Sequence, residues 1–397
     1  MLRLLTAGDS HGPALVGIVE GMPAGVEVRT GAVDEQLARR WLGVGRGGRR
    51  KVEADRVRIL AGVRFGRTTG APVALMIENA AHLADRAGWP EVLAVDGDGA
   101  GVDPVTLPRP GHADLAGAAK YGFDAPPRGP DLRPVIERAS ARETAMRVAC
   151  CSVARQMLAA LGIDVASHII RLGDVAYTED QERDALRDGL LADGARALNA
   201  AADASSVRML DGGLTDAAVA RIESARSDGD TLGGAYEIVA TGVPTGLGSF
   251  VHWDRRLDGL LAQAILSIPG QKAVEVGDGV AGAGRRGSAV HDEITASASR
   301  TTNRAGGVEG GVTNGMPVIV RGYMKPIPTL VKPLGSVDLA TGEAVPARYE
   351  RSDVTSVPAA SIVAEAMVAW VLAGATLERY GGDTMESIVR AMALSDG

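Results

Sequence analysis

The longest apolar segment of the chain, residues 362–377, most constrains what the chain can fold into. Glu365 interrupts this segment, and the segment falls short of the roughly 18 to 20 residues that a helix needs to cross a bilayer. It predicts a buried helix inside a large core. The chain has 397 residues, 46% apolar and 23% charged, which is an ordinary globular composition and long enough to build such a core.

Sequence patterns predict further helices and strands. Apolar periodicity and end signals predict helices at residues 33–42, 142–161, 255–267 and 359–380. Ser140 and Glu143 form a capping-box pattern at the start of the second helix. Short β-branched or alternating segments predict strands at residues 57–63, 72–77, 234–241 and 317–322. Strands and helices do not alternate in βαβ order, so the pattern favours a layered α+β fold over a doubly wound parallel sheet.

The chain shows no composition typical of a linker, so we predict a single domain over residues 1–397. The most polar stretch, residues 177–205, is interpreted as a peripheral excursion rather than a domain boundary. The 52 glycines have no fixed period and gather in clusters between the predicted elements. Two of these clusters, residues 276–287 and 305–311, are typical of mobile covers that fold over a ligand.

Charge and cysteine content limit the classes of partner. A net charge of -7 argues against a general affinity for nucleic acid or anionic membranes. The two cysteines, Cys150 and Cys151, are adjacent, which disfavours an unstrained disulfide and resembles no metal site. The apolar stretch of residues 1–6 is too short for a signal peptide. We therefore expect a reduced, cytoplasmic protein with no nucleic-acid, membrane or metal partner.

Two of the six histidines lie in short turns. His11 lies in Gly-Asp-Ser-His-Gly at residues 8–12, and His112 lies in Arg-Pro-Gly-His-Ala-Asp at residues 109–114. A turn that fixes the backbone on both sides of an imidazole suits a ring that must stand at a set distance from a group that it protonates. Each turn taken alone is equally consistent with a surface turn that contains histidine. The basic residues elsewhere in the chain favour the catalytic interpretation.

A dense basic segment, residues 39–51, occurs in this acidic chain. Its glycines match G-x-G-x-x-G, but the segment follows a predicted helix where a dinucleotide fingerprint requires a strand before it and a helix after it. Nucleic-acid-binding RGG tails are longer, repeated and disordered. Arginine forks bind phosphate and carboxylate, and glycines let the backbone approach closely. The pattern therefore favours a site for a small polyanion over a solvated basic loop.

Other candidate anion ligands are scattered along the chain. They are Arg109 beside His112, Arg138 beside the helix start at Ser140, and Arg351 beside Asp353. The helix start is equally consistent with a phosphate seat and with simple capping. Residues 325–330, Lys-Pro-Ile-Pro-Thr-Leu, form a rigid turn that presents a lysine and a threonine hydroxyl.

The absence of known catalytic motifs excludes several reaction classes. Walker A, kinase, zinc and Gly-x-Ser-x-Gly sequences are absent. Ser10 and His11 are sequence neighbours, which seldom have the geometry of a nucleophile and its base. A nucleotide phosphotransferase would require a metal-binding carboxylate pair near a phosphate loop, and an RNA-binding module would not explain the second basic group near Arg351. The remaining set suits an acid/base or elimination enzyme that acts on a phosphorylated acid.

With these residues together, the chain resembles the chorismate synthase family from residue 3 to the final helix. Seven motifs occur in order, at residues 8–12, 45–49 (Gly-Arg-Gly-Gly-Arg), 109–114, 140–144 (Ser-Ala-Arg-Glu-Thr), 310–315 (Gly-Gly-Val-Thr-Asn-Gly), 324–330 (Met-Lys-Pro-Ile-Pro-Thr-Leu) and 350–353 (Glu-Arg-Ser-Asp). The resemblance implies helices packed between antiparallel β-sheets, a homotetramer and bound reduced FMN. It also implies a redox-neutral 1,4-elimination of phosphate from 5-enolpyruvylshikimate 3-phosphate, which gives chorismate in the last step of the shikimate pathway. An intrinsic NADPH-dependent flavin reductase activity occurs in some members of the family only.

The resemblance also implies roles for individual residues. His11 would protonate or hold the reduced flavin, His112 would act as general acid on the departing phosphate, and Asp353 would assist proton removal at the N5 side of the flavin. The substrate would be clamped by Arg40, Arg46, Arg49, Arg109, Arg138 and Arg351. The contacts to FMN would fall on Arg40, Arg46, Arg138, Ala139, Ser140, Gln263, Ala264, Gly310, Lys325, Pro326, Ile327, Pro328, Thr329 and Arg351.

The chain departs from the family pattern in two places. Asp9 stands where glutamate is usual, and residues 269–277 lack the phenylalanines expected there. Aromatic residues make up only 3% of the chain. Few side chains can therefore stack on an isoalloxazine ring, and we expect the bound substrate to supply much of that stacking.

Overall fold

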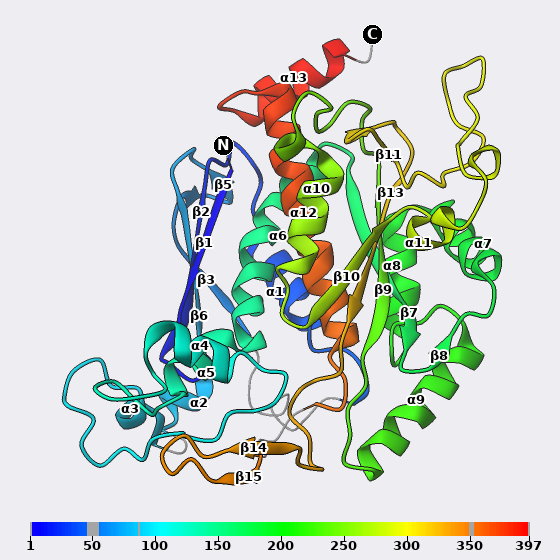
Figure 1. Ribbon diagram of the computed structural model, residues 1–397. Helices are drawn as coiled ribbons and strands as arrows, with labels where there is room; N and C mark the ends of the chain where they lie inside the picture. The colour runs from blue at the N-terminus through cyan, green and yellow to red at the C-terminus, as the bar shows by residue number, and fades with distance from the viewer. Residues whose placement is uncertain (1, 46–54, 86–87, 349–352, 396–397) are drawn as a thin grey trace.

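Two antiparallel sheets enclose a layer of helices in the computed structural model, which describes residues 2–45, 55–85, 88–348 and 353–395 (Figure 1). The first sheet has the strand order β1 (Arg3–Ala7), β2 (Ala14–Glu20), β6 (Val73–Glu78), β3 (Val57–Ala61). The second has the order β10 (Gln271–Val276), β13 (Val318–Met324), β9 (Gly234–Thr241), β7 (Asp164–Leu172), β8 (Val175–Ala176). Every neighbouring pair in both sheets is antiparallel. The predicted α+β sandwich is confirmed.

The helix layer is centred on α6 (Thr144–Ala160) and α12 (Val357–Tyr380), which pack against each other. Beside them lie α1 (Thr30–Arg39) and α10 (Leu257–Leu266). Buried residues occur on all sides of α12 because it contacts α6, α10, β7 and β9. This helix is long and apolar enough to cross a membrane, but most of it is buried inside the protein. The prediction of a buried core helix is confirmed.

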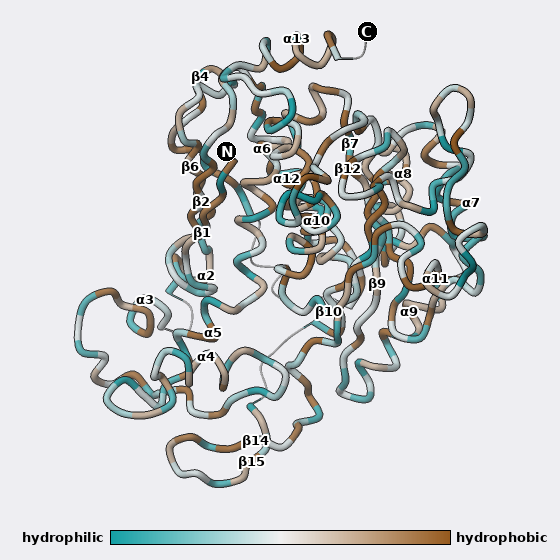
Figure 2. Tube along the Cα trace, turned by 45° about the horizontal axis from the view of Figure 1, so that its top comes forward, coloured by the Kyte–Doolittle hydropathy of each residue, from teal (hydrophilic) through white to brown (hydrophobic). Residues whose placement is uncertain are grey.

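The outer face of the second sheet is covered by the polar segment predicted as a peripheral excursion. This segment forms α7 (Asp180–Leu191) and α8 (Ala195–Ala204), and α9 (Gly212–Ser227) follows. Leu198 of α8 packs with Ala166 of β7 and Val239 of β9 in a small second core. Hydrophobic residues gather along both sheets and the enclosed helices, whereas α7 is hydrophilic (Figure 2). One large apolar cluster joins both sheets through the helix layer.

Shorter elements complete the structure. One end of the sandwich carries α2 (Ala80–Leu83), α3 (Trp89–Val92), α4 (Asp114–Tyr121), α5 (Arg133–Ala139), β14 (Gly335–Val337) and β15 (Ala344–Pro346). The remaining elements are β4 (Val63–Arg64), β5 (Arg67–Thr68), α11 (Gly279–Ala283), β11 (Val308–Glu309), β12 (Val312–Thr313) and α13 (Met385–Ser395).

Element boundaries differ from the predictions where local geometry intervenes. The strand predicted at residues 57–63 ends at Ala61, because Gly62 takes a φ of 84° and a Cβ there would lie 2.4 Å from the carbonyl oxygen of Pro72. Ser140 caps the 3₁₀ turn before α6, where its Oγ accepts a hydrogen bond from the backbone N–H of Arg142 at 3.3 Å, but the predicted capping box at the start of the α-helix does not form. A 3₁₀ turn (Ala141–Glu143) precedes α6, and the Glu143 carboxylate pairs with Arg147, one turn later in the helix.

Close packing of α6 on the first sheet depends on Gly17 of β2. A Cβ at this position would lie 2.4 Å from Sγ of Cys150. Cys150 and Cys151 are buried free thiols, and burial raises the pKa of Cys150 to about 12. The cysteines act as small apolar core residues, as expected for adjacent cysteines that form no disulfide.

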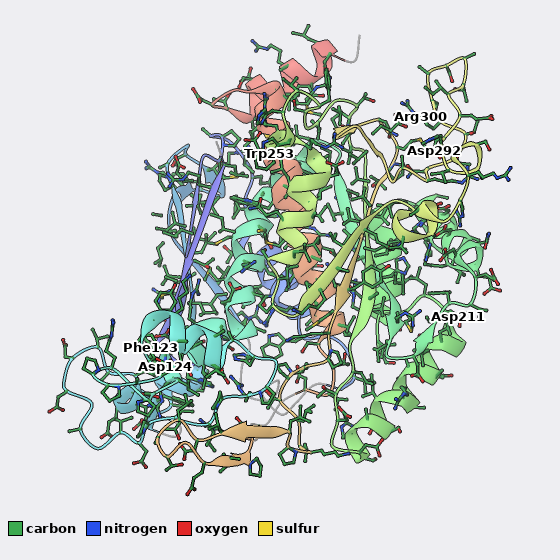
Figure 3. The ribbon with its side chains drawn as sticks, viewed as in Figure 1. Phe123, Asp124, Asp211, Trp253, Asp292 and Arg300 are labelled. Atoms are coloured by element: carbon green, nitrogen blue, oxygen red, sulfur yellow. The ribbon has the colours of Figure 1, made fainter. Side chains whose placement is uncertain are left out.

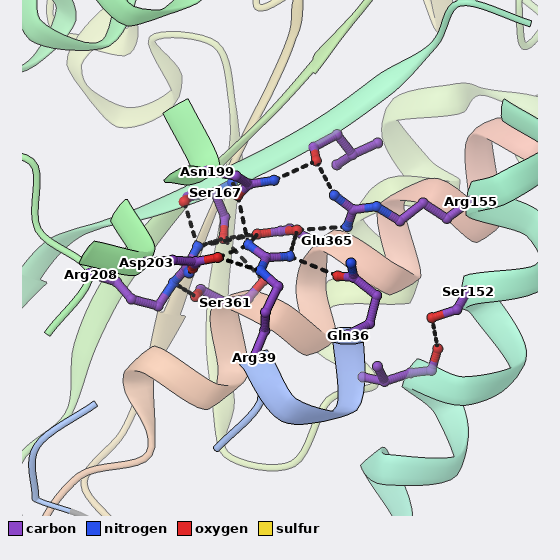
Figure 4. A network of polar contacts seen from close by, with 12 residues as sticks. Gln36, Arg39, Ser152, Arg155, Ser167, Asn199, Asp203, Arg208, Ser361 and Glu365 are labelled. Carbon is purple, nitrogen blue, oxygen red and sulfur yellow. Dashed lines mark hydrogen bonds and ion pairs between the residues drawn. The ribbon is translucent and has the colours of Figure 1, made fainter. Parts of the chain in front are cut away.

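The one charged residue of the long apolar segment, Glu365, is fully buried in a polar network between the helices and the second sheet (Figure 4). Its carboxylate pairs with Arg39 of α1 at 2.8 Å, with Arg155 of α6 at 2.6 Å and with Arg208 at 3.3 Å. Burial alone would raise the pKa of Glu365, but the surrounding arginines hold it below its ordinary range. The network therefore ties the helix layer to the loop that precedes α9.

We expect Glu365→Gln to lower the free energy of unfolding by about 3 to 5 kcal/mol, because the substitution leaves buried arginines without their counter-charge. Guanidinium denaturation at pH 7 measures this loss. The pKa of Glu365 is lower in the folded state, so its contribution is complete above the unfolded value of 4.5 and is lost as the pH falls below it. Glu378→Gln is the matched control, since Glu378 is an exposed glutamate of α12 paired with Arg255, and it should change stability by less than about 1 kcal/mol. Equal stability of both variants would contradict a stabilising role for the network.

Candidate active site

Both histidine turns are attached to one pair of helices at the end of the sandwich, at lower left in Figure 1. The turn at residues 8–12 joins β1 to β2 and contacts Glu137 of α5. The turn at residues 109–114 leads into α4. These helices pack closely, because Gly117 of α4 leaves room for Val135 of α5: a Cβ on Gly117 would lie 2.6 Å from Cγ1 of Val135. One scaffold therefore sets the position of both imidazoles.

Contacts from three short helices fix the His11 ring. The backbone N–H of His11 donates to Oε2 of Glu137 at 2.7 Å, and its Nδ1 lies 2.8 Å from Oε1 of the same carboxylate. The indole of Trp89 stacks on the imidazole with ring centroids 4.0 Å apart and planes within 8°. The carbonyl oxygen of His11 lies 2.9 Å from Nδ1 of His82, and Asn79 donates to the carbonyl of Gly12 at 2.6 Å. The prediction that this turn holds the backbone on both sides of the ring is confirmed.

The capped helix start contacts the same turn. Ser140 Oγ donates to Oγ of the buried Ser10 at 3.1 Å, and the backbone N–H of Ser10 donates to the carbonyl of Glu137 at 3.2 Å. Arg142 donates to Oδ1 of Asn79 at 2.8 Å and pairs with the buried Asp55 at 2.6 Å. Ser140 is therefore a cap and also a partner of the His11 turn, while a phosphate seat there remains a prediction.

The His112 ring is held from within its own turn. Its Nδ1 is hydrogen-bonded to Oδ1 of Asp114, a fully buried residue. Arg109 pairs with the same carboxylate through Nε at 2.8 Å and Nη2 at 3.1 Å. Burial alone would raise the pKa of Asp114, but the hydrogen bonds from His112 and Arg109 hold it well below its ordinary value. Asp114 is therefore ionised at neutral pH and orients both side chains.

The segment Lys325–Thr329 lies against the His112 turn. Lys325 Nζ donates to the carbonyl of Gly111, and its backbone N–H donates to the carbonyl of Gly270 at 3.0 Å. Burial, with a smaller effect of Lys272, lowers the pKa of Lys325. Thr231 Oγ1 donates to the carbonyl of Ile327 at 2.7 Å. The structure thus brings together two motifs that lie more than two hundred residues apart in the sequence.

Asp353 lies where three segments meet. The next residue, Val354, donates its backbone N–H to the carbonyl of Gly45 and accepts from Leu232, both at 2.8 Å. Gly45 lies in the basic segment and is the last residue described before position 46, and Leu232 is adjacent to Thr231, which donates to the carbonyl of Ile327. The residue after Asp353 is therefore linked by backbone hydrogen bonds to Gly45 and to Leu232, which follows the partner of Ile327.

The predicted arginine ligands fall into three groups. Arg40 is buried and donates to Thr144 Oγ1 at 3.1 Å and to the carbonyl of Ala141 at 2.8 Å, at the start of α6. Arg138 is exposed and donates to the carbonyl of Thr6 at 3.0 Å, just before the His11 turn. Arg46, Arg49 and Arg351 lie outside the described residues. Arg109 and Arg138 therefore lie at the two histidine turns, and Arg40 lies at the start of α6.

The predicted flavin contacts are only partly brought together within one chain. Gln263 and Ala264 lie near the end of α10, where Ser267 accepts a hydrogen bond from Arg147 at 2.8 Å, and this end leads to Gly270 and Lys325. Gly310 lies at the opposite end of α10, where its carbonyl accepts from Arg256 at 3.1 Å. Gln263 of α10 follows Arg256 by seven residues, which is a rise of about 10 Å along the helix axis.

The two glycine-rich clusters do not cover the histidine turns of the same chain. They lie beside β10, α11 and β11, at the right of Figure 1, together with the loop that carries Asp292 and Arg300 (Figure 3). A hollow of about 900 Å³ against α7 is lined by Asp278 and Arg285 of the cluster at residues 276–287, together with residues 301–304. That these clusters close over a ligand stays a prediction, and the pairing of β10 with β13 places the start of the first cluster at the second sheet.

Sequence reasoning missed the carboxylates that orient the histidines. Asp114 lies two residues from His112, so the local sequence pattern could have predicted its role. Glu137 lies 126 residues from His11, so no local pattern predicts this contact. Trp89, which stacks on His11, is likewise supplied only by the fold. Among the residues that the structure describes, no group of three or more His, Cys, Asp or Glu side chains could hold a metal ion.

Both imidazoles share one chemical arrangement. In each, Nδ1 faces a buried carboxylate, and no described residue forms a hydrogen bond with Nε2. A histidine held in this way can exchange a proton with a ligand at Nε2 while its orientation stays fixed. Lys325 and the arginines near the turns favour an anionic ligand beside these rings.

Comparison with known proteins identifies the family. The family model described as chorismate synthase matches residues 2–377. The chorismate synthase of Salinibacter ruber is 57% identical over 98% of this chain and 97% of the relative, and that of Chlorobaculum tepidum is 53% identical over 98% and 96%. A crystal structure of chorismate synthase, 36% identical, superimposes with a TM-score of 0.75 and covers 99% of this chain and 97% of the other. The chain therefore belongs to the chorismate synthase family, whose members are carbon-oxygen lyases of aromatic amino acid biosynthesis.

Proposed function

We propose that this protein binds reduced FMN and eliminates phosphate from 5-enolpyruvylshikimate 3-phosphate to form chorismate. The observation that carries the proposal is the pair of imidazoles, each oriented at Nδ1 by a buried carboxylate and each without a described partner at Nε2. An elimination that expels an anion needs an acid at the leaving group and cations around it. Membership of the chorismate synthase family supports this reaction.

His112 acts as general acid on the departing phosphate. The ionised Asp114 accepts a hydrogen bond from Nδ1, so the proton available for transfer is carried on Nε2. As the carbon–oxygen bond breaks, this proton neutralises charge that develops on the phosphate oxygen. Arg109 and Lys325 lie next to His112 and increase the positive potential there.

The residues present fit a flavin with its anionic phosphate tail. Lys325, Ser140 and Thr329 offer donors, and Pro326, Ile327 and Pro328 provide apolar surface beside them. Reduced FMN would supply electron density to the substrate and recover it, so the reaction needs no net redox change. His11 would hold or exchange a proton beside the flavin, and Asp353 would assist proton removal on the N5 side. The proposed set of ligands is completed by Arg40, Arg46, Arg49, Arg138, Ala139, Gln263, Ala264, Gly310 and Arg351.

We further propose a cytoplasmic homotetramer. The resemblance to the family supports the tetramer, and the two buried free thiols suit a reducing compartment. NADPH would serve to reduce the flavin if this chain shares the reductase activity of some family members.

The proposed reaction can be tested directly. Under anaerobic conditions, with chemically reduced FMN and 5-enolpyruvylshikimate 3-phosphate, we expect release of phosphate and formation of chorismate in equal amounts. Phosphate release and chorismate absorbance measure the two products. Oxidised FMN in place of the reduced form should give no turnover without a reductant. Absence of turnover with reduced FMN would contradict the proposed function.

The kinetics of a His112 variant distinguish catalysis by His112 from binding of the substrate. We expect His112→Ala to lower kcat by about 10²- to 10⁴-fold, with little change in KM, because the general acid acts in the transition state. His252→Ala is a matched control, since His252 also pairs with an aspartate two residues later, at 2.7 Å, but is exposed. This control should retain full activity. A rise in KM equal to the fall in kcat would show that His112 only positions the substrate.

A further inference from the structure

We propose that Glu137 is the positioning residue that fixes the tautomer of His11, so that Nε2 is the ring nitrogen that exchanges a proton. This inference rests on the proposed function only for the step in which the ring exchanges that proton during the reaction. The tautomer itself follows from the contacts of Glu137 and can be measured without turnover.

The two oxygens of the buried Glu137 carboxylate contact different atoms of His11. Oε2 accepts from the backbone N–H of His11 at 2.7 Å, a group that can only donate. Oε1 lies 2.8 Å from Nδ1 of the same residue. A carboxylate accepts at both oxygens, so Nδ1 must carry the hydrogen of this second bond. In the neutral ring the proton is therefore on Nδ1, and Nε2 presents a lone pair.

The surroundings of His11 prevent the ring from turning over. Trp89 stacks on it at 4.0 Å with nearly parallel planes, so the plane of the ring is fixed. A 180° rotation about the Cβ–Cγ bond would return the ring to the same plane but place Cδ2 instead of Nδ1 beside Glu137, and the 2.8 Å hydrogen bond would be lost. The ring is 26% exposed, and within the described part of the chain Nε2 has no hydrogen-bond partner. Only Nε2 is then available to a ligand.

The proton balance of this arrangement is simple. When the ring is protonated, both nitrogens carry hydrogen and the Nδ1–H bond to Glu137 is retained. Transfer of the Nε2 proton to a ligand leaves the neutral Nδ1–H tautomer, which Glu137 already stabilises. The ring therefore returns to its starting state by taking a proton at Nε2, with no reorientation.

The variant Glu137→Gln tests the tautomer assignment. The glutamine amide is nearly isosteric with the carboxylate, but it has one acceptor oxygen and one donor NH₂ group in place of two acceptor oxygens. The backbone N–H of His11 requires an acceptor, so the amide oxygen must occupy the place of Oε2. The amide NH₂ then faces Nδ1 and donates to it. We expect the neutral His11 ring to change to the Nε2–H tautomer in this variant, while the fold is retained.

Ring-¹⁵N histidine labelling of the full chain measures the tautomer, and with six histidines the His11 signals are assigned by their loss in His11→Ala. At a pH where the ring is neutral, the wild type should show the Nδ1–H pattern and Glu137→Gln the Nε2–H pattern. Glu78→Gln, an exposed glutamate paired with Arg58, should leave the wild-type pattern unchanged. An unchanged tautomer in Glu137→Gln would overturn the proposal.

Kinetics then separate positioning from a structural role. Glu137→Gln should lower kcat by about 100-fold with KM changed less than about threefold, and it should cause no further loss in the His11→Ala background. A further loss there would show that Glu137 acts by another route, and a changed tautomer with full activity would show that the reaction does not use it. Both results would overturn the proposal. Failure of the wild type to form chorismate would instead contradict the proposed function and leave the tautomer result intact.

Discussion

The buried Glu365 and the arginines around it are the contact on which the helix layer depends. Three cations from separate segments converge on one carboxylate that has no access to water. Such a cluster is stable only when every member is in place, because each unpaired charge would be costly in the interior. It fixes the end of α1 at Arg39. The next residue, Arg40, reaches the start of α6, so a core contact determines where a predicted ligand-binding arginine stands.

The same principle recurs at the end of the sandwich. Glu137, Asp114 and Asp55 are buried carboxylates that hold His11, His112 and Arg142 in single orientations. In each case a buried carboxylate orients the side chain that it contacts, and His11 and His112 are the partly exposed ones. This arrangement is preorganised, since the polar groups need not rearrange when an anionic ligand arrives. The loops that carry the histidines gain their rigidity from these carboxylates rather than from regular secondary structure.

Much of the fold could be predicted from local pattern. The buried helix at residues 362–377, the strand at residues 234–241 and the helix at residues 142–161 follow from periodicity and end signals, and the structure confirms their types. Boundaries were less predictable. The strand that ends at Ala61 does so because the carbonyl of Pro72 packs against Gly62, a contact between segments that local sequence does not encode. The surface that the glycine clusters face was not predictable from local sequence, because glycine content shows where the backbone is unusual and not which surface it faces.

The sequence by itself determined the residue types of the site: two histidines in glycine-bounded turns, a set of arginines, and a lysine between prolines. It determined them because turn chemistry and charge are local properties that a single segment displays. Only the tertiary structure decided which groups orient those residues. Glu137 and Trp89 come to His11 from distant segments, and Gly111 meets Lys325 across the molecule. These contacts arise from the packing of α4 and α5 against the sandwich, so the direction in which each imidazole presents its reactive nitrogen is a property of the whole fold.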